Sequence, residues 1–129
     1  MMVLSAAQLV GTWTLETVTV TRPGSTITLR NPDVSGMLCY SPDHHLLAMI
    51  RLSKAPPAAG SFPLPEFIAY AGCAAISGDQ IECRVQIGSD RALVGSVQTR
   101  MAVLRDHQLH LSTSYMESEA VLTWRKAAS

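Results

Sequence analysis

The chain has 129 residues, 47% of them hydrophobic, and its 10 basic and 10 acidic residues give a formal net charge of zero. We expect a single domain over residues 1–129, because a domain of about this length buries roughly two thirds of the surface of its unfolded chain. The balanced charge argues against nucleic acid or a membrane surface as a partner, and the apolar runs are far shorter than the roughly 18 residues that cross a bilayer.

The first residues predict a short helix that leads directly into a strand. Ser5 and Gln8 have the spacing of a capping box, in which each side chain accepts a hydrogen bond from a backbone N–H of the first turn. Gly11 then ends the helix and lets the backbone turn. This segment has neither the positive charge nor the long apolar core of a signal peptide, and we expect a cytoplasmic protein.

Alternation of apolar and polar residues predicts strands along the rest of the chain. Residues 12–21 have a period of two, with Trp13, Leu15, Thr17 and Thr19 on one face. Turn residues separate successive strands, for example at 23–25 after this strand and at 41–44 between two later ones. The other predicted strands are residues 26–30, 36–40, 45–52, 71–76, 81–87, 96–104, 109–114 and 119–125.

Two segments interrupt the series of strands. Residues 53–65 hold four of the 7 prolines and cannot pair along a sheet, so they predict a surface connection or a lid over an opening. Residues 66–70 are expected to add one helical turn. Eight or nine short strands with hairpin-length links, without strand–helix–strand alternation, predict an all-β, antiparallel up-and-down barrel. Closure of the barrel removes the exposed strand edges.

Neither a metal site nor a catalytic triad is expected from the histidines, serines and cysteines. His44 and His45 are adjacent and would point to opposite faces of a strand, while His107 falls in a turn away from His110. Ser96 lacks the glycine-framed turn of a nucleophilic serine. We therefore expect no cofactor. The cysteines lie in apolar strand patterns and are expected to be buried, reduced thiols: Cys39, Cys73 and Cys83.

Several motifs together resemble a known family. They include Gly11-Thr12-Trp13 at the first strand, Ser41-Pro42-Asp43 at a turn, and Leu122-Thr123-Trp124-Arg125 near the end. In this order, and with residues 36–40, 67–72, 94–96 and 109–113 between them, they resemble the lipocalin-like single-domain family of small bacterial and fungal barrels. Where similar chains usually have glycine after Ser-Pro-Asp, this chain has His44, which can adopt the left-handed turn conformation with some strain.

The resemblance implies a barrel that encloses one small ligand. Trp13 would plug the closed end, with Arg125 across its ring in a contact of about 0.5 to 2 kcal/mol. The middle strands are rich in Ala, Cys and Met, which suggests a cavity shaped for an apolar ligand. Alternation alone leaves open which face of these strands lines the cavity.

Polar residues within the apolar strands are the candidate site. Arg100, Tyr70 and His45 are the candidate catalytic residues, because a donor or acid in a dry cavity can stabilise a carbonyl or enolate oxygen. An eight-stranded barrel leaves room for one small molecule, lined by apolar side chains with a few polar ones. The candidate ligand-binding residues are Tyr40, Met49, Arg51, Arg84, Gln86, Met101, His110 and Tyr115.

The expected function is binding of a small hydrophobic molecule inside the barrel. The first hypothesis is a cofactor-independent cyclase or isomerase of secondary metabolism. The alternative is a non-catalytic binding or carrier protein for a small apolar ligand. A third hypothesis is a structural or homodimer-forming module whose barrel is filled by its own side chains.

Overall fold

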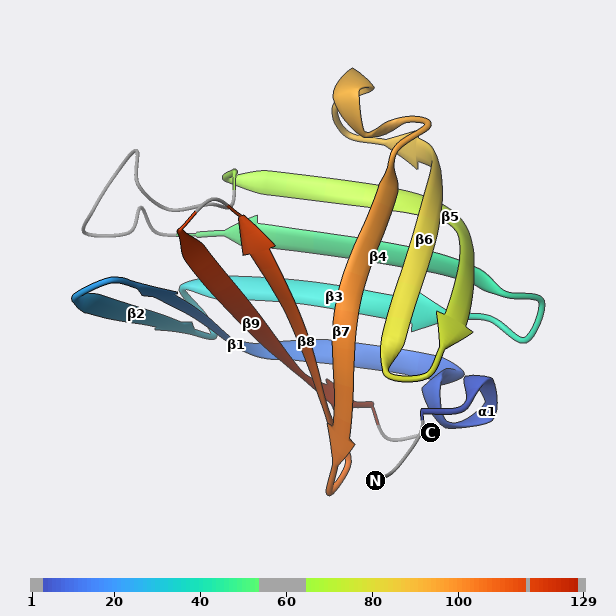
Figure 1. Ribbon diagram of the computed structural model, residues 1–129, viewed down its shortest axis with the longest axis horizontal. Coiled ribbons are helices and arrows are strands. Elements are labelled where there is room, and N and C mark those ends of the chain that lie inside the picture. Colours follow the sequence, from blue (N-terminus) through green and yellow to red (C-terminus); the bar gives the residue numbers. More distant parts are fainter. Residues whose placement is uncertain (1–3, 54–64, 116, 128–129) are drawn as a thin grey trace.

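The computed structural model describes residues 4–53, 65–115 and 117–127 (Figure 1). Within these residues a short helix precedes nine strands, which all pair in antiparallel fashion in one sheet. The elements are α1 (Ala6–Leu9), β1 (Gly11–Arg22), β2 (Ser25–Arg30), β3 (Val34–Tyr40), β4 (His45–Leu52), β5 (Phe67–Ser77), β6 (Gln80–Gly88), the 3₁₀ turn η1 (Arg91–Leu93), β7 (Val97–Arg105), β8 (Gln108–Tyr115) and β9 (Ser118–Lys126).

The sheet closes on itself through its first and last strands. Neighbouring strands follow the order β2-β1-β3-β4-β5-β6-β7-β8-β9, and β1 also pairs with β9. The ring therefore consists of β1 and β3 to β9, while β2 pairs with the second half of β1 and extends away from the ring (Figure 1). The prediction of an all-β, antiparallel up-and-down barrel with a short N-terminal helix is confirmed.

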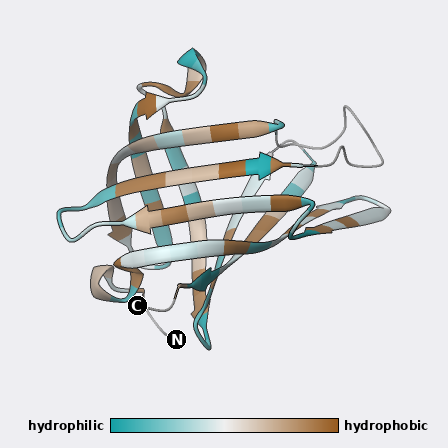
Figure 2. Cartoon of the chain, turned by 180° about the vertical axis from the view of Figure 1, so that it is seen from behind, coloured by the Kyte–Doolittle hydropathy of each residue, from teal (hydrophilic) through white to brown (hydrophobic). Residues whose placement is uncertain are grey.

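Alternating side chains build the core inside this barrel. Leu46, Ala48, Ile50 and Leu52 of β4 are buried, and the residues between them are more exposed. The same banding of hydrophobic and hydrophilic residues marks the other strands (Figure 2). Among the described residues, every fully buried side chain is hydrophobic, so the barrel encloses an apolar interior.

One strand departs from the simple period of two. The register of β1 against β9 shifts between Leu15 and Thr17, which is a β-bulge. The extra residue exchanges the faces of the strand, so that Val18 and Val20 are buried. The prediction that Thr17 and Thr19 share the face of Trp13 was therefore wrong.

The helix and one lysine cover the closed end of the barrel. Ser5 and Gln8 form the predicted capping box, and Trp13 Nε1 donates a hydrogen bond to the Leu9 carbonyl at 2.9 Å. Trp13 pairs with Lys126, whose Nζ lies 5.5 Å from the centroid of a Trp13 ring. The indole face therefore carries a cation at the base of the barrel.

Arg125 does not lie across Trp13, as the resemblance had implied. Successive residues of a strand face opposite sides, and Lys126, not Arg125, is the cross-strand partner of Trp13. Arg125 instead faces outward, where its Nε lies 2.9 Å from Glu16 Oε2. The cation over the Trp13 ring is therefore Lys126, one residue beyond the expected Arg125.

The segment before β5 also differs from its prediction. The expected helical turn at residues 66–70 is wrong, because β5 begins at Phe67 and pairs with β4 from Arg51–Phe67 to His45–Cys73. Pairing along the whole of β4 outweighs the weak local preference for a helix. Residues 54–64, which make up most of the predicted lid, lie outside the described part of the chain.

The cysteines have three different environments. Cys83 is buried, Cys39 is partly buried and Cys73 is exposed, and all three are free thiols. The expectation of three buried thiols was therefore wrong for Cys73, which lies on the outer face of β5. Among the described residues, none of the helical structure is long and apolar enough to cross a membrane.

Candidate functional site

A row of polar side chains runs along the inner face of β7. Gln98 and Arg100 pair with Cys83 and Ile81 of β6, which are both buried, and directly paired residues share a face of the sheet. Arg100 Nη2 donates to Gln98 Oε1 at 3.0 Å, and Arg100 Nη1 donates to the preceding backbone carbonyl at 2.8 Å. Gln98 Nε2 in turn donates to Ser96 Oγ at 3.0 Å. The row holds a permanent positive charge at the wall of an apolar interior.

Tyr70 lies within electrostatic reach of this arginine. Its partly buried side chain packs against the core, and its cross-strand partner on β4 is the small residue Ala48. Burial raises the pKa of the Tyr70 hydroxyl, and the charge of Arg100 offsets only part of that rise. Burial likewise raises the pKa of the Cys83 thiol against the opposing effect of Arg100. Tyr70 is therefore a protonated donor at neutral pH.

The barrel wall is interrupted beside these groups. The β7–β8 ladder extends from Arg105–Gln108 to Met101–Ser112, whereas β7 pairs with β6 as far as Val97. The two strands diverge from their common hairpin (Figure 1). Gln98 and Arg100 lie on the stretch of β7 that the ladder with β8 does not reach.

Small residues occupy many inward positions. An eight-stranded barrel is just wide enough for its side chains to fill it or for one small ligand to enter. Small inward side chains favour room for a ligand. The buried small residues are Ala48, Gly72, Ala74, Ala102 and Ala120. The methionines expected to shape the cavity lie outside instead, since Met37, Met49 and Met101 are each more than 40% exposed.

The predicted site residues divide between the two faces of the sheet. Arg100, Tyr70 and Tyr40 face the interior, but the Tyr40 hydroxyl is already engaged: it donates to the Ala74 carbonyl at 3.2 Å and lies 2.9 Å from His44 Nδ1. The side chain of Tyr115 lies outside the described part. The outer face carries His45, Met49, Arg51, Arg84, Gln86, Met101 and His110.

Two of the outward residues are held by neighbours on the surface. The Arg51 guanidinium lies 5.4 Å from the centroid of the Phe67 ring. His110 Nδ1 lies 3.1 Å from Thr123 Oγ1 on β9. Both contacts form between strands on the outside of the barrel. Arg51 and His110 therefore lie on the opposite face of the sheet from Arg100.

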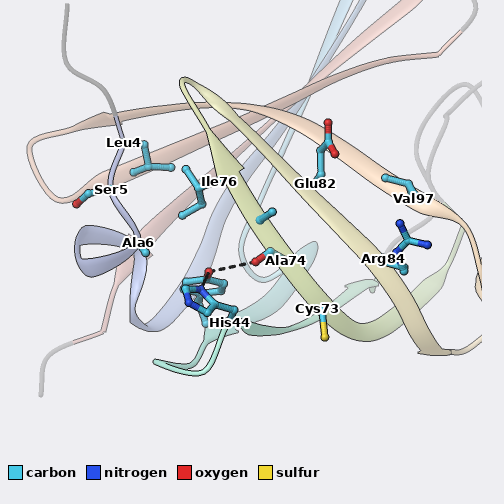
Figure 3. A pocket seen from close by; sticks show the side chains of 12 residues that line it. Leu4, Ser5, Ala6, His44, Cys73, Ala74, Ile76, Glu82, Arg84 and Val97 are labelled. Atoms are coloured by element: carbon cyan, nitrogen blue, oxygen red, sulfur yellow. Dashed lines mark hydrogen bonds between the residues drawn. The ribbon is translucent and has the colours of Figure 1, made fainter.

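A hollow of about 730 Å³ lies where the N-terminal segment approaches β5 and β6 (Figure 3). Its lining combines residues 4–6, at the start of α1, with Tyr40, His44, Cys73 and Arg84. Two of the predicted binding residues, Tyr40 and Arg84, therefore share this hollow rather than the row on β7. The sequence did not indicate it, because its walls come from segments that only the closed barrel brings together.

Ser96, Gln98 and Cys83 were not predicted from the sequence as neighbours of Arg100. Alternation along β7 was the available signal, since residues 96, 98 and 100 share a face once Arg100 is placed inside. In the described residues no group of three His, Cys, Asp or Glu side chains has the arrangement of a metal site.

Comparison with known proteins identifies the family. No curated protein matches the chain. The model of the family described as "Lipocalin-like domain" matches residues 10–127, the span that runs from the end of α1 to just beyond β9. A barrel of this kind suggests binding of a small hydrophobic ligand. The chain belongs to the lipocalin-like domain family.

Proposed function

We propose that the barrel binds a small hydrophobic molecule with a carbonyl, carboxylate or enolate oxygen, which Arg100 and Tyr70 hold. The observation that carries the proposal is the position of Arg100 on the inner face beside protonated Tyr70, in an interior whose fully buried side chains, among the described residues, are all hydrophobic. Arg100 is partly buried, and a charge held partly away from water is stabilised by hydrogen-bond partners. The bonds of Arg100 to Gln98 and to one backbone carbonyl use only part of the five donors of its guanidinium.

We further propose that the protein is a cofactor-independent cyclase or isomerase. The Arg100 guanidinium is a cation, and its charge would stabilise an oxygen that becomes an enolate, most strongly where bulk water is excluded. Tyr70, kept neutral by burial, can donate a hydrogen bond or a proton to the same oxygen. The apolar walls would hold a flexible substrate in a reactive conformation.

The binding proposal is tested with matched probes of equal chain length. Decanoate and decanol differ in their head groups, and the buried Trp13 and Trp124 provide a fluorescence signal for the interior. We expect Arg100→Gln to weaken decanoate binding at least tenfold, since a hydrogen bond to a charged group contributes about 1.5 to 3 kcal/mol, and to change decanol binding little. Arg105→Gln, exposed at the far end of the same strand, is the matched control.

An equal loss of affinity for both probes, or no loss for decanoate, would contradict the role of Arg100 in binding.

Catalysis is tested separately with 2-decanone in D₂O, where enolate stabilisation gives deuterium exchange at the carbons next to the carbonyl. We expect wild-type protein to accelerate this exchange and Tyr70→Phe to slow it by a larger factor than it weakens binding of the ketone. Saturable binding without exchange would instead support the carrier function.

A further inference from the structure

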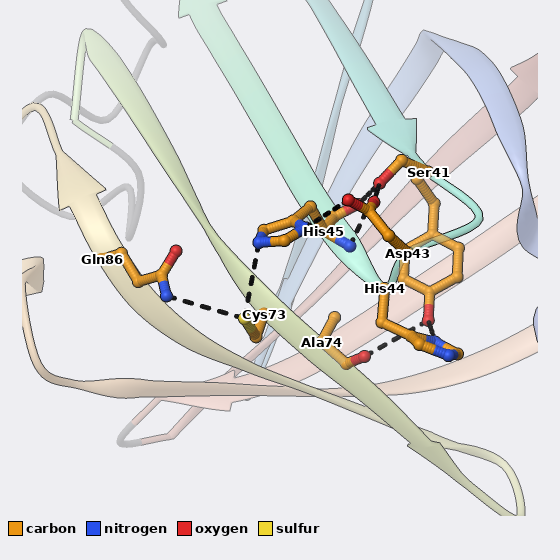
Figure 4. A network of polar contacts seen from close by, with 8 residues as sticks. Ser41, Asp43, His44, His45, Cys73, Ala74 and Gln86 are labelled. Carbon is orange, nitrogen blue, oxygen red and sulfur yellow. Dashed lines mark hydrogen bonds and ion pairs between the residues drawn. The ribbon is translucent and has the colours of Figure 1, made fainter.

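A cysteine, a histidine and an aspartate lie in line on the outer face of the barrel (Figure 4). Cys73 of β5 and His45 of β4 are direct cross-strand partners, and Cys73 Sγ lies 3.7 Å from His45 Nε2. On the other side of the ring, His45 Nδ1 lies 3.2 Å from Asp43 Oδ2. Gln86 of β6 donates from its Nε2 to Cys73 Sγ at 3.6 Å. Cysteine, histidine and a polar third residue form catalytic triads on unrelated folds.

The turn between β3 and β4 holds Asp43 against the histidine. Ser41 Oγ donates to the Asp43 carboxylate and accepts from the His45 backbone N–H at 3.2 Å. His44 has a φ of 69°, the left-handed conformation that tightens the turn. The hydrogen bonds from Ser41 and then His45 lower the pKa of Asp43, so the carboxylate is ionised at neutral pH.

This carboxylate sets the tautomer of His45. An ionised acceptor beside Nδ1 keeps the ring proton on Nδ1, so that Nε2 has a free lone pair. Nε2 is the atom that faces the thiol of Cys73. The geometry therefore provides an accessible thiol, a base in contact with it, and a carboxylate that orients the base.

We propose that Cys73 is a nucleophile that accepts acyl groups from esters or thioesters with an apolar acyl chain. His45 Nε2 takes the thiol proton while Sγ bonds to the carbonyl carbon. The bond to the leaving oxygen or sulfur then breaks, and that atom takes the proton from His45, which releases an alcohol or thiol. Water activated by His45 then hydrolyses the Cys73 thioester to a carboxylic acid and the free thiol. The Gln86 amide, beside Sγ, donates to the carbonyl oxygen as it becomes negative.

An apolar strip that starts at the thiol provides a place for the acyl chain. Beyond the His45–Cys73 pair, the next pairs on the same outer face are Leu47–Ala71 and Met49–Ala69. Leu47 and Met49 are each 51% exposed. An acyl chain bonded to Cys73 and lying along this strip would remove apolar surface from water. Longer acyl chains should therefore react faster than acetyl groups.

Other charged groups approach the thiol from β6. Arg84 is the cross-strand partner of Cys73 and lines the same hollow as Cys73 and Glu82. The titratable and charged groups around Cys73 are therefore His45 and Asp43 on one side and Arg84 and Glu82 on the other. None of them belongs to the row on β7, so the outer and interior proposals can fail independently.

The test measures acylation of the Cys39→Ser protein, which removes the partly buried thiol and retains buried Cys83. We expect 4-nitrophenyl octanoate to release 4-nitrophenol and to place an octanoyl group on Cys73, as mapped by peptide mass spectrometry. His45→Gln in this background should lower the acylation rate at pH 7 at least tenfold, because a positioned base contributes about 10²-fold or more. Equal rates with and without His45, or acylation elsewhere, would overturn the proposal.

Asp43 is a positioning residue, and its role is tested through the pH profile. In the same background Asp43→Asn should lower the rate, because the ring proton is no longer held on Nδ1, and should move the rise of the acylation rate to lower pH, because loss of the carboxylate charge makes the His45 imidazolium less stable; Asp43→Glu should restore both. An unchanged profile would remove Asp43 from the mechanism even if His45→Gln failed to fold.

The apolar strip is tested through acyl-chain selectivity. Leu47→Ser should lower the ratio of octanoyl to acetyl transfer. Val103→Ser, at a side chain 45% exposed on β7, is its control, and equal ratios would exclude the strip.

Discussion

Glu16 connects three strands on the outside of the barrel, at the bulge of β1. Its Oε2 accepts from Arg125 Nε at 2.9 Å and its Oε1 accepts from Gln108 Nε2 at 2.8 Å. The hydrogen bond from Arg125, followed by that from Gln108, lowers the pKa of Glu16 from its ordinary value of 4.5. A single carboxylate therefore joins β1 to both β8 and β9.

These contacts predict a pH-dependent contribution to stability. Because the pKa of Glu16 is lower in the folded than in the unfolded protein, its contribution is present above the unfolded value near 4.5 and is lost as pH falls through the folded value. At pH 7 we expect Glu16→Gln to lower the free energy of unfolding by about 0.3 to 1 kcal/mol, as for exposed ion pairs. The measurement is urea unfolding at pH 7 and pH 3.

The difference between wild type and Glu16→Gln should shrink at pH 3. A constant difference at both pH values would show that the carboxylate charge is not involved. Glu119→Gln, exposed on the same strand as Arg125, is the control and should change stability by a few tenths of a kcal/mol at most.

At the scale of the elements, β5 and β6 approach each other at a bulge. Their register shifts between Ala71 and Gly72, and a Cβ on Gly72 would lie only 1.9 Å from the Arg84 carbonyl oxygen. Backbone, not a movable side chain, occupies that space. Gly72 is therefore required by the close approach of two strands that carry Tyr70, Cys73 and Gln86.

We expect Gly72→Ala to destabilise the protein by about 1 to 3 kcal/mol, the usual cost of overpacking. The displacement of β6 should also separate Gln86 from Cys73 and slow the acylation proposed above. Thermal unfolding is the measurement, with Ala75→Ser, exposed on the same strand, as control. An unchanged melting temperature would mean that the two strands can move apart without cost.

At the scale of the molecule, the closed ring and its extension should differ in local stability. Each ring strand has neighbours on both sides, whereas β2 pairs with β1 alone among the described elements. Opening β2 therefore breaks one ladder, while opening β4 breaks its ladders with β3 and β5.

Native-state hydrogen exchange checks this difference. We expect the paired amides of β2 to exchange at least tenfold faster than those of β4, because local opening costs less free energy at an edge with few buried contacts. Equal protection of the two strands would mean that β2 unfolds only with the whole barrel.

The sequence by itself determined the strands of the barrel and the short helix that precedes them. Period-two alternation, the capping box of Ser5 and Gln8 and the turn residues are local signals, and each strand and hairpin follows from side chains that are close in the chain. The interior position of Arg100 could also be proposed, as a polar residue in an apolar strand. Residues 66–70 were wrongly predicted as a helical turn, because the pairing of β5 with β4 is not local in the sequence.

Only the tertiary structure decided which side chains meet. One extra residue at the bulge of β1 reverses the faces of that strand, and one position along β9 exchanges Arg125 for Lys126 over Trp13. Once the inner face is known, the same alternation places the Arg100 side chain inside the barrel and the His45 side chain outside, next to Cys73. Period two fixes which residues share a face, but only closure of the ring decides which face is buried.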